Sequence, residues 1–283
     1  MTLLSKLPLS WLQQLGRFAG LLVNSFPNEF RRISRINIGL CFPDLSSQAQ
    51  HRLTKQSLRE SGKTLFEMPA FWLCSAEKTL RHLVRVEGEA LVKRAFQQGK
   101  GLILLCPHLG AWELINLYLA EHYPLIVLYK PTKMAYFQKL MHKARQRYGS
   151  TLVPTDRQGV KALYQGLAKG KAIMILPDQN PGKNGSEYAH FFGQPTLTMT
   201  LVNRLTQKNQ PPIFFIYAER LPGSQGYVIH FSSADPAVGD PDPLISAAAL
   251  NHGLEACIRE IPHQYLWAYK RFKQPPAGSH SIY

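Results

Sequence analysis

The chain has 283 residues, a formal net charge of +15 and 45% hydrophobic residues, a share typical of a globular protein with a core. Its four cysteines are scattered and form no C-x-x-C pair, so they neither suggest a disulfide framework nor supply a zinc ligand set. The charge indicates attraction to a polyanion, which can be an anionic membrane surface, a nucleic acid, or an acidic protein or phosphorylated substrate.

The first 26 residues have neither the pattern of a signal peptide nor an apolar run near the ~20 residues that a membrane-spanning helix needs. Apolar residues recur here at helical spacing, with tryptophan and phenylalanine among them: Trp11, Leu12, Leu15, Phe18, Ala19, Leu22, Val23 and Phe26. A basic cluster follows: Arg31, Arg32 and Arg35. The pattern predicts an amphipathic helix that lies in the membrane interface, or one that packs on its own domain.

Further along, helices are expected at 47–71, where Ser47 and Gln50 have capping-box spacing, and at 76–83 and 89–98. A short strand at 85–87 precedes the last of these. Strands and helices then alternate, and a loop with several glycines spans 178–193. The expected strands are 102–106, 125–128, 152–153, 172–176, 213–219, 227–231 and 265–269, with a hairpin joining 213–219 to 227–231. The expected helices are 112–121, 136–148, 158–168, 198–207 and 242–260.

This alternation predicts an α/β fold with a largely parallel central sheet flanked by helices, preceded by the N-terminal amphipathic membrane-associating helix. The chain divides into an interfacial segment (1–36), the α/β domain (37–274) and a disordered tail (275–283).

His108 directly follows the expected buried strand 102–106, and ligands gather at the carboxyl ends of strands in open α/β sheets. Glu113 lies five residues on, a separation that turns the two side chains apart on a regular helix. The pair can therefore meet only if His108 lies outside the helix, in a turn that Gly110 permits. A carboxylate bonded to one imidazole nitrogen orients the ring, and the other nitrogen can take a proton from a hydroxyl.

Several other side chains near this motif have two interpretations. Cys106 is either a nucleophile beside His108 or a small apolar residue at the end of a buried strand, and we favour the second. A basic stretch, made of Lys139, Lys143, Arg145 and Arg147, is either a solvated helix face or an anion-binding surface. Phe191, Phe192 and Trp112 either line an acyl-chain channel or belong to the core. The remaining histidines have no ligand spacing, so we expect no metal.

The sequence resembles the bacterial lipid A late acyltransferases, of the lauroyl and myristoyl type, within the larger glycerolipid and lysophospholipid acyltransferase superfamily. The matching segments, in order along the chain, are Asn-Ile-Gly-Leu-Cys-Phe-Pro-Asp at 37–44, the H-x-x-x-x-E motif at 108–113, Leu-Tyr-Lys-Pro at 128–131, Pro-Asp-Gln at 177–179, Phe-Phe-Gly-Gln-Pro at 191–195, Ala-Glu-Arg at 218–220 and Gln-Tyr-Leu-Trp at 264–267. Pro107 and Pro177 depart from the residues that the family often has at these positions.

The resemblance implies an acyltransferase in which His108 is the general base and Glu113 its orienting partner. It further implies that Arg145, Asp178 and Lys130 bind substrate, with Arg145 toward an acceptor phosphate or developing negative charge. No cofactor is expected, because the acyl group arrives on a thioester of acyl carrier protein or CoA.

The leading hypothesis is O-acyl transfer from an acyl carrier protein thioester to a hydroxyl of a lipid A precursor. The acceptor could instead be a lysophospholipid, glycolipid or aminolipid, with acyl-CoA as a possible donor. A third hypothesis is a non-catalytic binder of anionic lipid. The expected partners are acyl carrier protein, an anionic phospholipid membrane and a phosphorylated lipid acceptor. No nucleic acid is expected, because no nucleic-acid module pattern is present. The expected location is the cytoplasmic face of the inner membrane, as a peripheral or monotopic protein.

Overall fold

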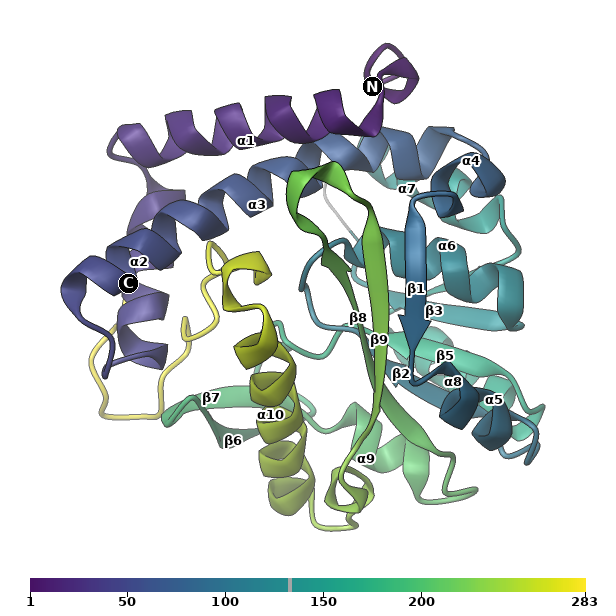
Figure 1. Cartoon of the computed structure of the whole chain (residues 1–283). Coiled ribbons are helices and arrows are strands. Elements are labelled where there is room, and N and C mark those ends of the chain that lie inside the picture. The colour runs from purple at the N-terminus through teal and green to yellow at the C-terminus, as the bar shows by residue number, and fades with distance from the viewer. Residues whose placement is uncertain (132–133) are drawn as a thin grey trace.

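The computed structural model describes residues 1–131 and 134–283 and is built around a seven-stranded sheet with strand order β1-β9-β8-β2-β5-β3-β4 (Figure 1). Its strands are β1 (Leu83–Glu87), β2 (Leu102–Leu105), β3 (Leu125–Tyr129), β4 (Thr151–Pro154), β5 (Ala172–Ile175), β8 (Ile213–Arg220) and β9 (Tyr227–Ser233). Every neighbouring pair runs parallel except β8 and β9, which form the predicted antiparallel hairpin. The prediction of a largely parallel sheet flanked by helices is confirmed.

Helices cover both faces of this sheet. They are α1 (Leu9–Ser25), α2 (Glu29–Cys41), α3 (Ser47–Leu73), α4 (Ala76–Leu80), α5 (Glu89–Phe96), α6 (Trp112–His122), α7 (Ala135–Gln146), α8 (Arg157–Ala168), α9 (Leu201–Thr206) and α10 (Pro243–Glu260). Short 3-10 turns lie at η1 (Leu4–Lys6), η2 (Pro222–Ser224), η3 (Pro236–Gly239) and η4 (Pro262–Gln264). Most helices begin within one or two residues of the positions that apolar periodicity predicts.

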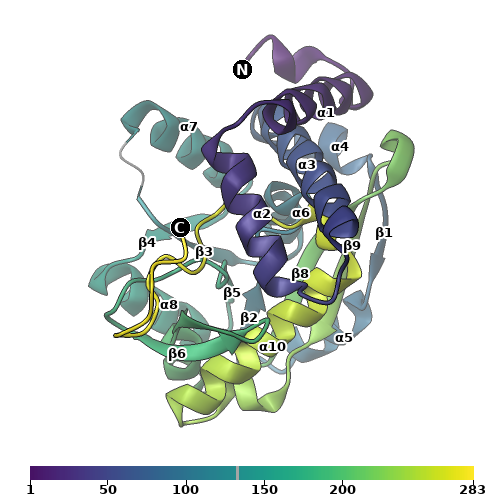
Figure 2. The same cartoon turned by 90° about the vertical axis from the view of Figure 1, so that its left-hand side faces the viewer.

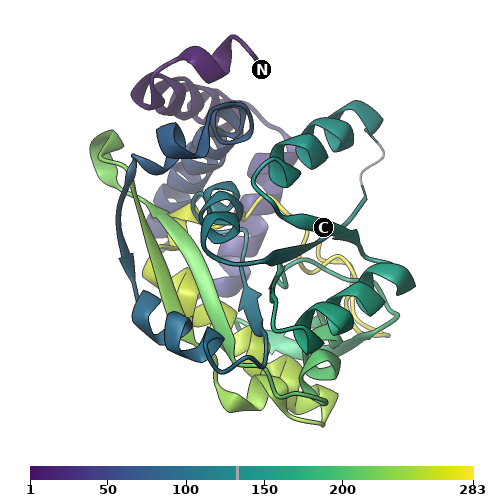
Figure 3. The same ribbon diagram turned by 90° about the vertical axis from the view of Figure 1, so that its right-hand side faces the viewer.

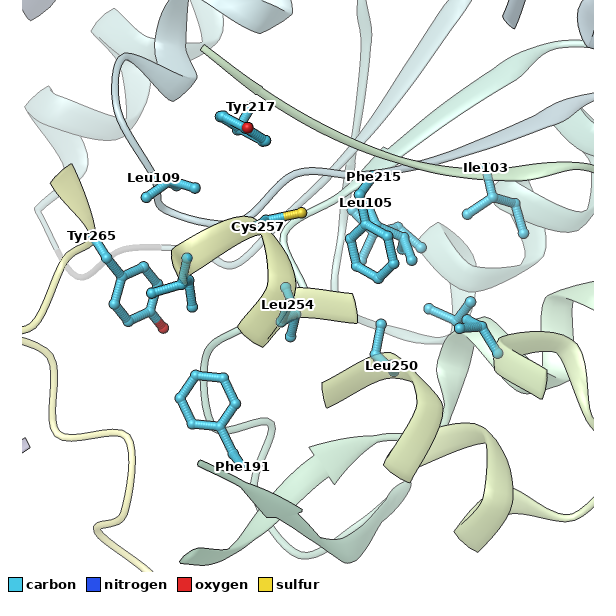
Figure 4. Packing of buried hydrophobic residues seen from close by; sticks show 14 of the residues in the cluster. Ile103, Leu105, Leu109, Phe191, Phe215, Tyr217, Leu250, Leu254, Cys257 and Tyr265 are labelled. Carbon is cyan, nitrogen blue, oxygen red and sulfur yellow. The ribbon is translucent and has the colours of Figure 1, made fainter. Parts of the chain in front are cut away.

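The central strands are apolar along their whole length because both of their faces are buried. All four residues of β2 are fully buried, and alternate side chains enter different cores. Leu102 and Leu104 pack with α5 and α6, whereas Ile103 and Leu105 pack with α8 and α10. Figure 4 shows the second of these cores, in which Leu250, Leu254 and Cys257 of α10 face the strands.

The segments 178–193 and 198–207 differ from the sequence prediction because they contain a hairpin whose turn was not predicted. The expected loop 178–193 contains β6 (Ser186–Phe191), which pairs antiparallel with β7 (Gln194–Met199). Phe192 and Gly193, both at positive φ, form the two-residue turn between them, so the glycine that indicated a loop closes a hairpin. The expected helix at 198–207 consequently begins only at Leu201, after β7.

The strand expected at 265–269 does not form. Tyr265 makes one isolated antiparallel bridge to Leu109. The backbone N–H of Trp267 then donates to the carbonyl of Tyr265, and the N–H of Tyr269 donates to the carbonyl of Leu266. These local bonds take the groups that a strand would need for pairing.

The N-terminal helix α1 lies along α3 at one end of the molecule (Figures 1 and 3). Its contact face consists of Leu9, Leu12, Gln13, Gly16 and Gly20, which are buried. A Cβ atom on Gly16 would lie 2.6 Å from the carbonyl oxygen of Gly62, so glycine lets the two backbones approach closely.

A buried polar network also ties α1 to the domain. Gln13 donates to the Glu67 carboxylate at 2.7 Å, and Tyr227 donates to it at 2.9 Å. Arg220 forms a two-pronged ion pair with the same carboxylate. Because the side chains of Glu67 and Arg220 are 0% and 1% exposed, this pair depends on α1 and α3 remaining in place.

The opposite face of α1 carries large apolar side chains that no part of the described chain covers. They are Trp11, Leu15, Phe18 and Leu22, exposed by 64%, 40%, 61% and 45%, and Phe26 and Phe30 continue them into the start of α2. None of the helices in the described residues combines the length and the apolar character that crossing a bilayer requires.

The C-terminal segment, expected to be disordered, is folded back against α2 (Figure 2). The Tyr283 hydroxyl donates to the side-chain oxygen of Asn37 and accepts from the backbone N–H of Phe272 at 3.1 Å. Asn37 also donates to the carbonyls of Trp267 and Tyr269. The last residues thus help to hold the segment that lies beside the His108 loop.

Candidate active site

His108 lies in the loop between β2 and α6, as the sequence predicts. β2 pairs in parallel with β5, and Leu105 is in register with Ile175. His108 and Asp178 each follow these paired residues by three positions, so they leave the same edge of the sheet side by side. This is the carboxyl edge, where open α/β sheets place their ligand sites.

Asp178 holds His108 with both carboxylate oxygens. One oxygen lies 2.8 Å from the imidazole Nδ1, and the other accepts the His108 backbone N–H at 3.0 Å. A carboxylate only accepts hydrogen bonds, so Nδ1 carries the proton and Nε2 keeps a lone pair. Gln179 lies next to that lone pair, with its side-chain nitrogen 3.2 Å from Nε2.

The surroundings keep Asp178 ionised. Its side chain is 2% exposed, and that burial acts to raise the pKa of its carboxyl group. The electrostatic effect of His108 and the hydrogen bonds from its side chain and backbone outweigh this effect and lower the pKa of Asp178 below its ordinary value. The imidazole itself is partly open, with 15% of its side chain exposed. The pair therefore combines a fixed buried carboxylate with an imidazole that is partly exposed at the sheet edge.

Glu113 is placed differently from the sequence prediction. It lies in the first turn of α6 and accepts hydrogen bonds from Trp72 Nε1 at 2.9 Å, from Arg145 Nε at 3.2 Å and from Arg145 Nη2. Among the hydrogen bonds of the described residues, none joins His108 to Glu113. His108 does lie outside the helix as expected, but the carboxylate that contacts its ring is that of Asp178.

The Glu113–Arg145 pair is almost completely enclosed, with side chains 5% and 12% exposed. Burial acts to raise the pKa of Glu113, but the charge and hydrogen bonds of Arg145, with the hydrogen bond from Trp72, lower it. The positive charge of Arg145, expected to face substrate, is thus compensated by a carboxylate in this structure. Asp178, also expected to bind substrate, has both oxygens occupied by His108.

The loop that carries His108 is clamped from two sides. The backbone carbonyl of His108 accepts the N–H of Leu266, and the N–H of Ala111 donates to the carbonyl of Ala218 at 2.8 Å. Gly110 lies between these bonds at φ +64°, where a Cβ atom would come within 1.9 Å of the Ala218 oxygen. Only glycine fits this position without displacing β8.

Gln264 connects this loop to the buried Arg220. Its side chain bonds to both backbone groups of Arg220, at 2.9 Å each, and its carbonyl accepts the N–H of Gly110 at 3.0 Å. Thr64 lies between the same two partners, accepting from the Arg220 guanidinium and donating to the Gly110 carbonyl. The His108 loop therefore rests on the network that also holds α1.

The remaining sequence hypotheses have clear structural settings. Cys106 is fully buried, and burial raises the pKa of its thiol well above the ordinary value, which disfavours a thiolate nucleophile. Phe191 and Phe192 are buried in the core, with Phe192 packed on Trp267. Trp112 lies edge-on to His108, with ring centroids 5.2 Å apart.

Lys130 is exposed just after β3, at the same carboxyl edge of the sheet. Burial raises the pKa of the Tyr269 hydroxyl, and the positive charge of Lys130 acts to lower it. The same hydroxyl accepts the backbone N–H of Asn180. Lys130 therefore lies on the side of the site formed by the Asp178–Asn180 segment. Of the five residues predicted for the site, the structure joins His108 to Asp178 and Glu113 to Arg145, and leaves Lys130 at the rim.

Sequence reasoning missed Gln179 and Trp72 as members of this site. Gln179 follows β5 as His108 follows β2, so the rule of strand carboxyl ends applied to both strands would have indicated it. Trp72 reaches Glu113 from the end of α3, and no local pattern in the sequence signals that contact.

The chain is also similar in sequence to known proteins. The family described as bacterial lipid A biosynthesis acyltransferase matches residues 1–274. The chain is 26% identical over 282 residues to a lipid A biosynthesis palmitoleoyltransferase of Escherichia coli (strain K12), covering 98% of this chain and 90% of that protein. It is 25% identical to the lauroyltransferase of the same organism, over 99% and 91% of the two chains, and 24% identical to its myristoyltransferase, over 94% and 81%. The chain belongs to the bacterial lipid A biosynthesis acyltransferase family and is an acyltransferase.

Proposed function

We propose that the protein transfers a fatty acyl group from an acyl carrier protein thioester to a hydroxyl of a lipid A precursor, with His108 as the general base. The observation that carries this proposal is the Asp178-held imidazole, whose Nε2 lone pair lies at the open carboxyl edge of the sheet. The names of the relatives support lipid A as the acceptor.

The chemistry needs no acyl-enzyme. The acceptor hydroxyl takes the place of Gln179 beside Nε2, its proton passes to that nitrogen, and its oxygen attacks the thioester carbonyl carbon. The C–O bond forms, the C–S bond breaks, and the thiolate leaves with the proton that His108 took up. Asp178 stabilises the imidazolium between these steps without itself taking the proton.

In this proposal the start of α6 stabilises the oxyanion. Its N-cap, Ala111, makes no side-chain hydrogen bond, and the helix begins directly after the His108 loop. Backbone N–H groups of an uncapped first turn carry partial positive charge toward developing negative charge. Glu113 and Arg145 hold this turn against α7 and α3, so we assign them a positioning role. In this proposal the exposed Lys130 supplies positive charge for a phosphorylated acceptor.

The uncovered apolar face of α1 supports binding to an anionic membrane. Tryptophan and phenylalanine side chains gain free energy by entering the interface, and the +15 charge draws the protein to anionic lipid. We therefore propose a peripheral or monotopic location on the cytoplasmic face of the inner membrane. There the base can meet a lipid acceptor from the bilayer and a thioester carried by acyl carrier protein.

The test is acyl transfer by the purified full chain, supplied with an acyl carrier protein thioester and a lipid A precursor in mixed micelles. We expect the His108→Gln variant to lose at least about a hundredfold in kcat, whereas the matched control His252→Gln, at an exposed position on α10, keeps it. Mass spectrometry of lipid A and phospholipids from cells with and without the protein identifies the acceptor. An unchanged lipid A profile with altered phospholipids would move the acceptor to a lysophospholipid, and equal activity of both variants would refute His108 as the base.

A further inference from the structure

A cavity of about 370 Å³ lies at the N-terminal end of the molecule, between η1, the first turn of α1, the end of α3 and α4. Its volume is within the range of small-molecule sites. Its lining includes Lys6, Leu9, Phe71, Cys74, Lys78 and His82. The cavity shares no residue with the His108 site, so acyl transfer does not account for it.

The charged side chains that line this cavity are those of two lysines. Lys6 and Lys78 are exposed, His82 stands beside them, and no acidic residue is in the lining. Within the described parts of the chain, no carboxylate forms an ion pair with either lysine. The nearest acid in sequence, Glu77, faces Arg81 at 3.9 Å. An anionic group is the ligand that this rim attracts.

Part of the wall of the cavity is apolar, and the cavity continues onto the face proposed to bind the membrane. Phe71 and Leu9 form buried parts of the wall, only 4% and 8% exposed. Ser10 belongs both to this cavity and to an adjacent hollow lined by Ser10, Trp11, Gln14 and Leu15. Trp11 and Leu15 are among the exposed apolar side chains of α1, so the cavity opens beside a surface suited to acyl chains.

From this combination we infer that the cavity binds one anionic glycerophospholipid of the bilayer. The phosphate lies between Lys6 and Lys78, and an acyl chain lies against Leu9 and Phe71. The inference rests on the proposed membrane-bound function and adds a lipid site that is separate from the acyl acceptor. A lipid held there fixes the N-terminal end of α1 in the interface, which plain insertion of Trp11 and Phe18 does not do.

Cys74 provides a reporter inside the cavity. It lines the wall, and it is half-buried while Cys41, Cys106 and Cys257 are buried. A maleimide should therefore modify Cys74 first, and a lipid in the cavity should block it. We expect vesicles of phosphatidylcholine with phosphatidylglycerol to slow this modification about tenfold, and phosphatidylcholine vesicles alone to slow it less than twofold.

Paired variants separate a lipid in the cavity from general docking. Lys6→Gln combined with Lys78→Gln should abolish the protection of Cys74, and the matched pair Lys169→Gln with Lys208→Gln, exposed elsewhere on the surface, should keep it. In a Cys74→Ala background, the Phe18→Cys variant reports docking of the α1 face outside the cavity. Its protection should persist when Lys6 and Lys78 are replaced.

Three results would overturn the inference: equal protection of Cys74 by both kinds of vesicle, full protection in the Lys6 and Lys78 double variant, or loss of Phe18→Cys protection in parallel with that of Cys74. The measurement uses no acyl donor. It therefore gives the same answer whether or not the protein transfers acyl groups, and failure of the acyl-transfer assay leaves it interpretable.

Discussion

Replacing Asp178 by asparagine tests the proposed base most directly. The aspartate accepts two hydrogen bonds from the same residue, one from His108 Nδ1 at 2.8 Å and one from its backbone N–H at 3.0 Å. An asparagine has only one oxygen, so its amide must direct NH₂ toward one of these groups. The backbone N–H can only donate, whereas the imidazole can change tautomer. The amide oxygen therefore turns to the backbone, and its NH₂ donates to Nδ1.

In that arrangement Nε2 carries the proton and cannot accept one from the acceptor hydroxyl. General-base catalysis contributes about 10²–10⁴-fold, so we expect kcat to fall by that factor, which corresponds to roughly 2.7–5.5 kcal/mol. The KM for the lipid should change little, because Asp178 is buried beneath His108.

The assay follows acyl transfer across pH with the purified chain in mixed micelles, and circular dichroism verifies the fold. Asp178→Glu is the companion variant, since it keeps the negative charge but adds a methylene. It should retain more activity than Asp178→Asn. An Asp178→Asn protein that is folded and keeps more than a tenth of the kcat would refute the assigned tautomer, and with it the role of Asp178.

Three further outcomes follow from the same geometry. Glu113→Gln leaves the Arg145 charge buried without a carboxylate, so urea unfolding should show that the free energy of unfolding falls by about 3 kcal/mol. The double variant Glu113→Gln/Arg145→Met should recover part of this loss. An unchanged unfolding midpoint of Glu113→Gln would contradict the importance of the pair. Gly110→Ala should lower the free energy of unfolding by more than about 2 kcal/mol and remove nearly all activity, because its Cβ would meet the Ala218 oxygen. A variant that melts at the wild-type temperature would contradict this and show that β8 can move to make room. The pKa values of Asp178 and Glu113 are lowered in the folded protein, so their contribution to stability is present above about pH 4 and declines as the pH falls. The acid-induced loss of melting temperature should be smaller in Asp178→Asn, and equal losses would contradict this origin.

The α/β class and the helix α1 follow from local patterns. Apolar runs such as 102–106 and helical periodicity such as that of 11–26 arise within a few residues of one another, so they can be read along the chain. The position of His108 at a strand end is equally local. The β6–β7 hairpin was missed because its turn places Phe192, a residue other than glycine, at positive φ.

The direction of the exposed apolar face of α1 needed the tertiary structure. The periodicity of α1 shows an apolar stripe, but it does not tell which side meets the protein. Close approach at Gly16 and a polar bond from Gln13 to Glu67 place the smaller and more polar side inward. The large apolar side chains then face outward, because the close backbone approach of α1 and α3 at Gly16 and Gly20 fixes the opposite side of the helix against the protein.

The sequence also identified residues that gather at the candidate site, but it did not identify which of them contact each other. His108, Glu113, Arg145 and Asp178 do gather at one edge of the sheet, yet proximity along the chain suggested His108 with Glu113. Strand order is set by collective packing between segments far apart, and β2 lies beside β5 although about 70 residues separate His108 from Asp178. That neighbouring strand supplies the carboxylate for the imidazole, and the buried Arg145 takes Glu113 because each charge needs a partner away from water.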